Sequence, residues 1–315
     1  MQKLKARFRV INFIFYILLI SCSIFVILDT FVIPHKSNLT SNSNKNEEIL
    51  NNNDMDDSSE ENEEDDINNS SVATITDNSY EDENISIKII TERANDTTYY
   101  VADISLSDSK YLKTALANDT YGRNIKETTS VMAQNNNAIF AINGDYYGFR
   151  DYGYVIRNGV LYRETADEDN DALVIDNDGN FSIVNESEVT ANELLNEGAW
   201  QVLSFGPALI EEGEVVVGKN DEVSQAKTSN PRTAIGQVDE LHYIVIVADG
   251  RTSESEGLSL YELAQVMKEY NCTTAYNLDG GGSSTMYFNG EVINNPTSGG
   301  SIGERSVSDI VYIGY

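Results

Sequence analysis

The chain has 315 residues and a formal net charge of −30 at pH 7; residues 1–84 hold six basic and sixteen acidic residues, so residues 85–315 retain −20. A domain this acidic repels nucleic acid and anionic membrane surfaces, and neither is an expected partner. With only two cysteines, Cys22 and Cys272, and two histidines, we expect no intradomain disulfide, no cysteine- or histidine-rich metal site and no cofactor.

The N-terminal segment has the length and composition of a membrane anchor. Four basic residues within residues 1–9 precede 19 uncharged residues, 10–28. At about 1.5 Å per residue, such a helix spans a hydrocarbon core of about 30 Å. Basic residues before the span and none close behind predict that the N-terminus lies inside the cell. We therefore expect a cytoplasmic tail (residues 1–9), a transmembrane signal anchor (residues 10–33) and an extracellular domain on a single-pass protein of the cell membrane.

Two alternatives remain open for this segment. A cleaved signal peptide has a shorter apolar region that ends in small residues. Residues 19–22 also loosely resemble a bacterial lipobox, in which Cys22 becomes lipidated. Apolar residues continue past Cys22 as far as Ile33, whereas a lipoprotein normally turns polar after its cysteine. The anchor helix is therefore the favoured interpretation.

Residues 34–84 are rich in Asn, Ser, Asp and Glu. They contain too few large apolar residues to offset the conformational entropy that folding removes. We expect a disordered acidic linker there, followed by the folded domain from residue 85.

Short β-rich runs dominate the rest of the chain. Strands are expected at 85–91, 99–106, 138–143, 202–217, 233–237, 242–248 and 307–313, with hairpins at 154–162 and 172–184. Thr190 and Glu193 open a short helix as a capping box. These patterns predict an α+β (mixed α/β) fold, in which residues 85–315 form a single domain with a mixed β-sheet flanked by helices.

The most regular helix is expected at residues 259–270. Ser259 and Glu262 form a capping box, and apolar residues then repeat at helical spacing. The helix lies between strand 242–248 and strand 275–278, an order that suggests a parallel crossover. A crossover places the loops that follow the two strands, 249–257 and 279–284, at the same edge of the sheet.

Three aspartates follow strands in glycine-containing turns: Asp145, Asp249 and Asp279. Asp-Gly is common turn chemistry, so an ordinary turn residue is the alternative interpretation of each aspartate. Asp279 is harder to explain in this way, because Gly280, Gly281 and Gly282 follow it and consecutive glycines cost backbone entropy. Close approach of a ligand to main-chain N–H groups is the usual compensation, and such a loop can form an anion-binding nest.

Arginines are scarce after the N-terminal tail, and three of them flank these motifs. Arg232 precedes a strand, Arg251 lies in the Asp-Gly-Arg turn and Arg305 lies just before the last strand. A guanidinium matches a phosphate through two parallel hydrogen bonds. The alternative is a surface ion pair, which is always available in so acidic a protein. We favour a functional role for Arg232 and Arg305, and leave Arg251 open.

Six ordered motifs resemble the phosphodiester glycosidase family. They are Asn-Gly-Asp-Tyr-Tyr at 143–147, Arg-Thr-Ala-Ile-Gly at 232–236, Ala-Asp-Gly at 248–250, the helix start at 257–264, Asn-Leu-Asp-Gly-Gly-Gly-Ser-Ser-Thr at 277–285 and Arg-Ser-Val-Ser at 305–308. The family includes the lysosomal uncovering enzyme and bacterial members labelled exopolysaccharide-related. The resemblance covers residues 95–315. This sequence differs from the lysosomal relative because it lacks a cysteine framework and has Asp145 where that relative has Gly. The sugar specificity of that relative is therefore not expected of this chain.

The resemblance implies hydrolysis of a sugar-1-phosphodiester in a phosphorylated carbohydrate. Our hypothesis is acid–base cleavage by two carboxylates, with arginines binding the phosphate. The expected catalytic residues are Asp279, then Asp249, then Asp145. The expected substrate-binding residues are Arg232 and Arg305 for phosphate, Gly280, Gly281, Gly282 and Ser283 as a cradle for its oxygens, and Asn143, Tyr146 and Tyr147 for the sugar.

Two other readings stay open. The first is a non-catalytic module that binds an anionic exopolysaccharide or wall polymer. The second places Ca²⁺ in one of the acidic turns, since such turns can supply oxygen ligands, although no loop has the ligand spacing of a known calcium motif.

Overall fold

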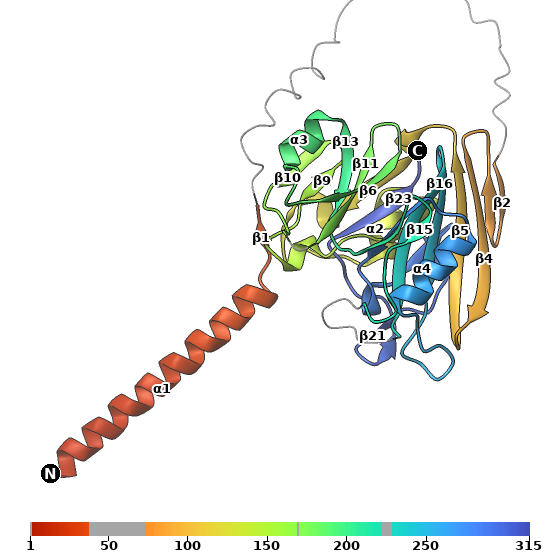
Figure 1. Cartoon of the computed structure of the whole chain (residues 1–315). Helices are drawn as coiled ribbons and strands as arrows, with labels where there is room; N and C mark the ends of the chain where they lie inside the picture. Colours follow the sequence, from red (N-terminus) through yellow and green to blue (C-terminus); the bar gives the residue numbers. More distant parts are fainter. Residues whose placement is uncertain (1, 38–72, 169, 222–228) are drawn as a thin grey trace, which may run out of the picture.

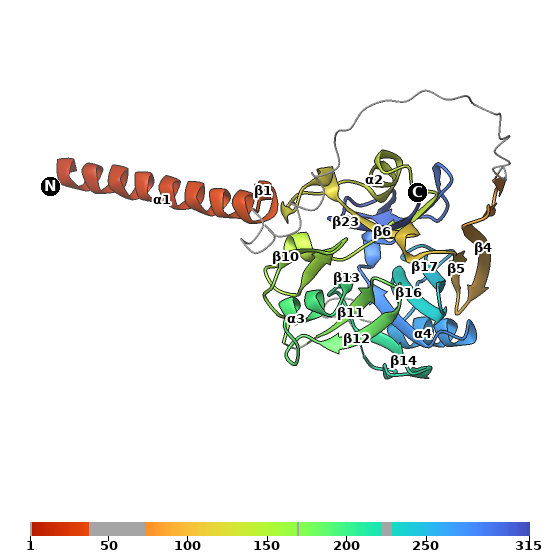
Figure 2. The same cartoon turned by 90° about the horizontal axis from the view of Figure 1, so that it is seen from above.

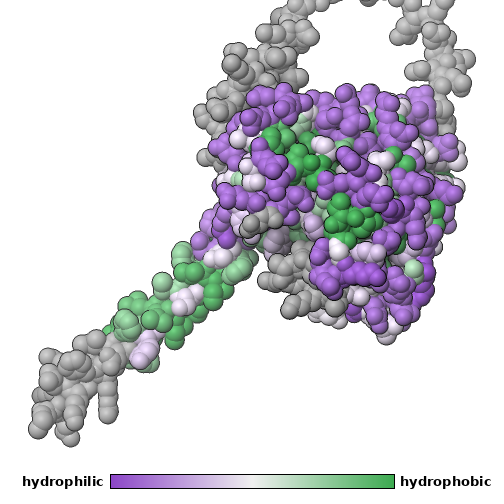
Figure 3. Space-filling view, in the orientation of Figure 1, coloured by the Kyte–Doolittle hydropathy of each residue, from purple (hydrophilic) through white to green (hydrophobic). Residues whose placement is uncertain are grey.

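A computed structural model describes residues 2–37, 73–168, 170–221 and 229–315. Helix α1 (Gln2–Phe31) extends from the domain as a rod (Figure 1). Its segment Phe13–Phe31 is apolar, exposed and long enough to cross a membrane. Figure 3 shows the same contrast on the surface, with a hydrophobic helix projecting from a largely hydrophilic domain. The expected N-terminal apolar helix is therefore present, and its orientation in a membrane stays a proposal.

The segment that directly follows this helix contacts the folded domain. Strand β1 (His35–Lys36) pairs with β7 (Gly122–Arg123). The Asn124 side chain donates hydrogen bonds to the carbonyls of Thr30 (3.0 Å) and Ile33 (3.1 Å). The expectation of a linker beginning at residue 34 is thus corrected at its start. Residues 38–72 of that linker lie outside the described residues.

The folded domain also begins earlier than expected. Strands β2 (Thr74–Thr76) and β3 (Ser79–Glu81) form a hairpin at the edge of the large sheet. Tyr80 is buried in the core, and Asp82 accepts hydrogen bonds from the N–H groups of Asn84 and Ile85. The boundary at residue 84 was wrong because this polar hairpin has a single large buried residue, too weak a signal against an acidic background.

The largest sheet has nine strands in the order β15-β14-β18-β16-β17-β5-β4-β3-β2. Its remaining members are β4 (Ile85–Ala94), β5 (Thr97–Leu106), β14 (Ala208–Glu211), β15 (Glu214–Val215), β16 (Arg232–Asp239), β17 (His242–Ala248) and β18 (Thr274–Leu278). Helix α4 (Leu260–Glu269) lies on one face of this sheet (Figure 1), and Ser259 and Glu262 form the expected capping box.

Two five-stranded sheets complete the domain (Figure 2). The first, β10-β9-β13-β11-β12, contains β9 (Val155–Arg157), β10 (Val160–Arg163), β11 (Asp171–Asp176), β12 (Phe181–Asn185) and β13 (Ala199–Leu203), with helix α3 (Ala191–Asn196). The second, β20-β19-β8-β23-β6, contains β6 (Leu112–Leu116), β8 (Phe140–Asn143), β19 (Met286–Phe288), β20 (Glu291–Val292) and β23 (Asp309–Ile313), with helix α2 (Thr129–Asn135). A small hairpin joins β21 (Thr297–Ser298) to β22 (Ser301–Ile302), and single turns of 3₁₀ helix lie at η1 (Ser109–Tyr111), η2 (Ala117–Asp119), η3 (Tyr147–Phe149) and η4 (Gly281–Ser283).

The expected crossover connection from β17 to β18 is confirmed, but strand β16 lies between these two strands in the sheet. Strands β17 and β18 each pair antiparallel with β16, so they run parallel to each other with β16 between them. Their C-terminal loops therefore share one edge of the sheet, as expected.

Neighbouring strands are antiparallel in every pair that the described residues form, which differs from the mixed sheet we expected. The domain is mostly β with some helices, so the α+β class is met only in part.

The run expected as a strand at 202–217 is divided into β13, β14 and β15. Gly206 has a φ of +75° and is followed by Pro207, which has no N–H for a ladder hydrogen bond. The chain therefore leaves one sheet after β13 and joins another at β14. This change of sheet brings the two sheets together at the cleft described below.

Both faces of the central strands are buried. Ile235 and Val245 point into the core shared with the second five-stranded sheet, whereas Ala234 and Ile246 pack on α4. Burial on both faces explains why these strands read as continuous apolar runs, without alternation. The result is a rigid platform whose β16, β17 and β18 ends carry the predicted motifs.

Candidate active site

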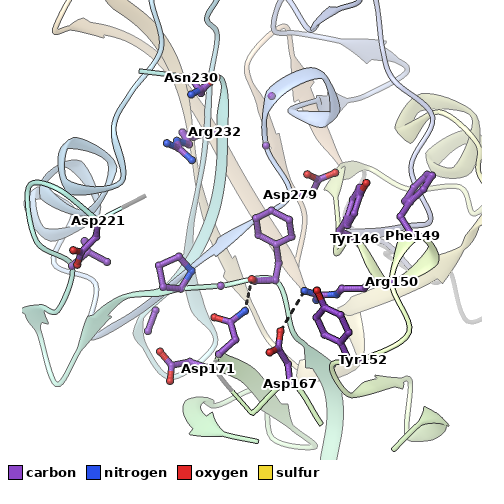
Figure 4. A pocket seen from close by; sticks show the side chains of 18 of the residues that line it. Tyr146, Phe149, Arg150, Tyr152, Asp167, Asp171, Asp221, Asn230, Arg232 and Asp279 are labelled. Atoms are coloured by element: carbon purple, nitrogen blue, oxygen red, sulfur yellow. Dashed lines mark hydrogen bonds and ion pairs between the residues drawn. The ribbon is translucent and has the colours of Figure 1, made fainter. Parts of the chain in front are cut away.

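A cleft of about 1520 Å³ lies where the large sheet meets loops of the first five-stranded sheet (Figure 4). Its lining combines arginines, carboxylates and aromatic rings. Of the residues expected from the sequence, it contains Asp279, Gly280, Gly281, Arg232, Arg305 and Tyr146, together with Arg251. Four of the six sequence motifs thus contribute to one cavity. Three of them lie at the ends of β8, β16 and β18, and the fourth contains Arg305.

Asp279 follows β18 and is only 8% exposed. Burial raises its pKa to about 6, against the opposing influence of the Ser283 hydroxyl, the Arg305 charge and the Gly280 N–H group. Its main-chain carbonyl accepts a hydrogen bond of 2.6 Å from the Asn143 side chain, which fixes the loop. A carboxyl group with a pKa near neutrality in a cleft is suited to proton transfer.

This raised pKa predicts a pH-dependent stability difference for the variant Asp279→Asn. The pKa in the folded state, about 6, lies above the ordinary value of 3.8, so folding disfavours the ionised carboxylate. As the pH rises from 3.8 to 6, the free energy of unfolding of the wild type therefore falls by about 3 kcal/mol through this group. The amide variant has no such group and does not show this loss. Urea unfolding of both proteins from pH 4 to pH 7 measures it. A difference that does not change with pH would contradict the raised pKa.

The three glycines allow two guanidinium groups to lie directly on the loop. A Cβ on Gly281, whose φ is +63°, would lie 2.8 Å from a terminal nitrogen of Arg251. A Cβ on Gly282 would lie 2.7 Å from a terminal nitrogen of Arg305. Side chains at these two positions would displace the arginines. The glycine run therefore has a steric reason that the sequence alone did not show.

The N–H groups of the glycine loop were expected to form an anion-binding nest, and three of them are engaged within the chain. The Gly281 N–H group donates to the Pro231 carbonyl (2.8 Å), and the Ser283 N–H group donates to the Gly280 carbonyl (3.2 Å). The N–H group of Gly280 is directed to the carboxyl group of Asp279. Because these donors are engaged within the chain, the positive charge at the loop comes from arginine side chains instead.

Arg251 and Arg305 carry that charge. Arg251 donates through Nε and a terminal nitrogen to the side-chain oxygen of Asn230, at 3.3 and 3.2 Å. The Arg305 main chain bonds to the Gly282 carbonyl (3.2 Å). Within the described part of the chain, neither guanidinium forms an ion pair with Asp or Glu. The surface ion-pair alternative is thus not supported for these two residues.

Arg232 is placed by the fold as the first residue of β16. It is only 2% exposed, and its Nε donates to the Leu258 carbonyl at 3.0 Å. Figure 4 shows Arg232 and Asn230 together on one side of the pocket, with Asp279 and Tyr146 beside each other across it. The structure therefore brings Arg232 to the cleft, as expected.

Asp249 does not line the cleft, although it lies at the predicted sheet edge. Its carboxylate accepts hydrogen bonds from the Asn294 side chain (3.1 Å) and from the main chain (2.8 Å) and side chain (3.1 Å) of Asn295. It is 4% exposed. The crossover correctly predicted its position, but the direction of its side chain depends on a loop that arrives 45 residues later. As a second catalytic carboxylate, Asp249 is corrected to an anchor for that loop.

Asp145 is also absent from the cleft lining and lies among arginines beneath it. It pairs with Arg150 (3.1 Å) and Arg157 (3.5 Å) and accepts a hydrogen bond from the Ser204 N–H group (2.9 Å). Burial alone would raise its pKa, but the charges of Arg150 and Arg157 outweigh burial and hold it below the ordinary value. An ionised, fully paired carboxylate organises the site and is a poor proton donor, which corrects the catalytic role expected for it.

Arg157 also binds Asp309, at 2.7 Å. Burial raises the pKa of Asp309 to about 6, and the arginine opposes this. The side chains of all three residues, Asp145, Arg157 and Asp309, are at most 1% exposed. Residues that follow β8, end β9 and begin β23 therefore meet in one buried ion network.

The expected sugar-contact residues divide into one in the cleft and two beneath it. Asn143 is buried, and its side-chain oxygen accepts hydrogen bonds from the Thr233 hydroxyl (2.9 Å) and the Thr285 N–H group (3.2 Å). Tyr147 is 1% exposed and stacks on Tyr121 at 5.2 Å. Both side chains are thus buried away from the cleft lining, Asn143 at the end of the fully buried strand β8 and Tyr147 at the start of η3.

Tyr146 remains accessible and lines the cleft. Its ring stacks on Phe149 at 4.8 Å and meets Phe205 edge-on at 6.5 Å, so three aromatic side chains cluster beside Asp279. Burial raises the pKa of the Tyr146 hydroxyl, and the negative charge of Asp279 adds to this. The phenol therefore stays protonated, as a hydrogen-bond donor beside the carboxyl group.

Several lining residues were missed by sequence reasoning. They come from the end of η3, from the segment that leads into β11 and from the β13–β14 turn, and include Arg150, Asp167, Asn170, Asp171 and Phe205. Arg150 bridges Asp145 to Asp167, the latter at 3.8 Å (Figure 4). The scarcity of arginine was a usable signal for Arg150, but nothing in the local pattern marked the others. Among the described residues, no group of three or more His, Cys, Asp or Glu side chains has a metal-binding arrangement.

Comparison with known proteins agrees with the family that the sequence motifs indicated. Residues 136–314, more than half of the chain, match the family model described as phosphodiester glycosidase. An uncharacterized SPbeta prophage-derived protein of Bacillus subtilis (strain 168) is 31% identical over 202 residues, which cover 62% of this chain and 31% of that protein. The N-acetylglucosamine-1-phosphodiester alpha-N-acetylglucosaminidase of Mus musculus is 29% identical over 157 residues, covering 46% of this chain and 30% of that enzyme.

The fold is shared with a solved catalytic domain. The zebrafish N-acetylglucosamine-1-phosphodiester alpha-N-acetylglucosaminidase domain superposes with a TM-score of 0.58 at 21% identity, covering 73% of this chain and 82% of that chain. At this identity the match shows the fold alone. The chain spans about a third of the length of the two curated relatives above.

Proposed function

Because the chain belongs to the phosphodiester glycosidase family, as its motifs indicated, we propose that its cleft hydrolyses a sugar-1-phosphodiester in a cell-surface glycan or related polymer. Water adds to the anomeric carbon, the bond from that carbon to the phosphate oxygen breaks, and a free sugar and a phosphomonoester are released. The observation that carries this proposal is the Asp279 carboxyl group, with a pKa of about 6, next to the arginines on the glycine loop.

The arginine side of the cleft is suited to the phosphate. Arg232, Arg251 and Arg305 all line it, and Arg251 and Arg305 pack on the loop that follows Asp279. A phosphomonoester leaves with additional negative charge, which guanidinium groups stabilise more strongly in the transition state than in the ground state. Because residues 85–315 carry a net charge of −20, this local positive charge is what permits an anionic substrate to bind.

The opposite side of the cleft supplies the remaining chemistry. Tyr146, Phe149 and Phe205 offer apolar ring surface for a sugar next to Asp279. Asp167 and Asp171 also line the cavity, and we propose one of them as the second carboxylate in place of Asp249. Two carboxylates on either side of the anomeric carbon are the usual requirement for glycoside hydrolysis.

The N-terminal helix extends this proposal to location. Basic residues before an apolar span of 19 residues favour an anchor with the domain outside the cell. The contact of β1 with β7 then holds the domain close to the end of the span. The substrate is accordingly expected among polymers near the membrane surface.

The direct test is an assay of the full-length chain in detergent with UDP-N-acetylglucosamine and an aryl sugar phosphodiester. Release of sugar supports the proposal, and kcat/KM should change near pH 6 as Asp279 titrates. A decrease above that pH identifies Asp279 as the acid, and an increase identifies it as the base. If neither substrate is cleaved while an anionic polymer binds with measurable affinity, the domain is a binding module and not a hydrolase.

The steric role of the glycine loop makes a separate prediction. Gly282→Ala should raise KM about 10- to 100-fold by displacing Arg305, because losing one charge-assisted contact costs about 1.5–3 kcal/mol. The melting temperature should change little, since the clash is with the flexible end of a side chain. Gly314→Ala is a matched control, because a Cβ there makes ordinary contacts of 3.4 Å or more. Equal KM values for the two variants would contradict the role assigned to Arg305.

A further inference from the structure

A second groove, of about 500 Å³, lies on the domain and shares no lining residue with the cleft. It is formed by the η1 turn, the β9–β10 turn, the β11–β12 turn and β13. The lining residues are Asp108, Ser109, Lys110, Lys113, Asn158, Asn177 and Trp200. The proposed hydrolysis assigns no role to this groove.

Trp200 is the most distinctive residue of the groove, because it is the only tryptophan in the chain. It lies on the exposed side of β13 between buried neighbours and is 37% exposed. The indole packs against Gly159, where a Cβ would lie 2.6 Å from a ring carbon. The hairpin turn thus supports the ring from one side and leaves indole surface for a ligand. Flat aromatic surface of this kind suits the apolar face of a sugar ring.

The groove is also locally positive in a strongly acidic domain. Lys113, on β6, is half-buried and forms no ion pair within the described residues. Burial lowers the pKa of Lys113. Lys110 pairs with Asp108 at 3.1 Å. Two lysines and one aspartate give the groove a net positive charge, although residues 85–315 together carry −20.

The polar groups around Trp200 are partly committed and partly available. The Asn158 side chain is engaged, donating to the Thr114 carbonyl (2.9 Å) and accepting from the Gln201 side chain (2.7 Å). Asn177 is exposed, and its main-chain carbonyl accepts a hydrogen bond of 2.6 Å from the Ser109 hydroxyl. The engaged residues hold the walls of the groove in place, and the Asn177 amide is placed at its edge to contact a sugar hydroxyl.

We propose that this groove binds an anionic sugar unit of a polysaccharide, with Trp200 stacking on the ring and Lys113 holding its carboxylate or phosphate group. An apolar ring, a half-buried lysine and an amide within one groove match the three chemical parts of such a ligand. The groove retains the polymer on the domain and is independent of the hydrolytic step. Hydrolysis of a small sugar phosphodiester should therefore be unchanged when the groove is altered.

The test uses the fluorescence of Trp200, which reports on the groove alone because the chain has no other tryptophan. The full-length chain in detergent is titrated with dextran, carboxymethyl dextran and phosphorylated dextran of equal length. A saturable change is expected with at least one anionic dextran, at an affinity about tenfold or more above that of neutral dextran. Comparison of the two anionic polymers identifies the preferred charged group.

Variants decide whether the groove is responsible. Lys113→Gln should weaken binding of the anionic dextran about tenfold, whereas Lys88→Gln, at an exposed position on β4, should leave it unchanged. Trp200→Phe, measured by calorimetry, should also weaken binding. The proposal is overturned by the absence of a saturable signal with all three polymers, by equal affinity for neutral dextran, or by wild-type affinity in the Lys113 and Trp200 variants. Cleavage of the small substrate in the same variants tests the proposed hydrolysis separately.

Discussion

Asp279→Asn should lower kcat for a sugar-1-phosphodiester by about 10²- to 10⁴-fold, the usual contribution of a positioned general acid or base. The amide has nearly the same shape and cannot exchange a proton. Its surroundings, the Arg305 guanidinium and the Ser283 hydroxyl, remain in place. The measurement is steady-state release of sugar at several pH values, and the transition near pH 6 should disappear together with the activity.

Asp249→Asn is the matched comparison, because it makes the same chemical change at the same sheet edge. Its carboxylate bonds to Asn294 and Asn295 instead of facing the cleft. We expect a loss of about 1–3 kcal/mol in unfolding free energy and a change of less than about tenfold in kcat. Retention of wild-type turnover by Asp279→Asn removes Asp279 from the mechanism. A collapse of turnover in Asp249→Asn alone would restore the assignment made from the sequence.

The largest expected effect on stability comes from Arg157→Leu. Arg157 lies between Asp145 and Asp309, and its removal leaves buried carboxylates with insufficient positive charge. Breaking one partner out of a buried ion pair costs about 3–5 kcal/mol. For a domain of this size, the melting temperature should fall by about 6–20 °C. Thermal and urea unfolding of the full-length chain measure the change.

Removing the opposite charge distinguishes electrostatics from lost packing. Asp309→Asn alone should be milder, because Arg157 keeps its contact with Asp145. The double variant Arg157→Leu/Asp309→Asn should regain part of the stability lost in Arg157→Leu, since one uncompensated charge is absent and Asp145 still pairs with Arg150. Strictly additive losses in the double variant would show that the network contributes through packing alone.

Local patterns predicted the elements of this domain well where signals were short-range. The capping box at Ser259 and Glu262, the helix that follows and the common edge of β17 and β18 are all present. Such features depend on residues within one turn or one strand, so nearby sequence is sufficient. The N-terminal hairpin from Thr74 was missed because an acidic, asparagine-rich background conceals one buried tyrosine.

The site was predicted at the level of loops and only partly at the level of side chains. The sequence by itself determined the family and the apolar N-terminal helix, and it singled out the loop after Asp279 that lines the cleft, because motifs and hydropathy are written in consecutive residues. Tertiary structure alone decided which of three similar aspartates faces the cleft. Asp145 pairs with Arg157, 12 residues later in the chain, and Asp249 accepts a hydrogen bond from Asn294, 45 residues later. Burial and pairing of a carboxylate depend on what packs around it, and no local pattern encodes those neighbours.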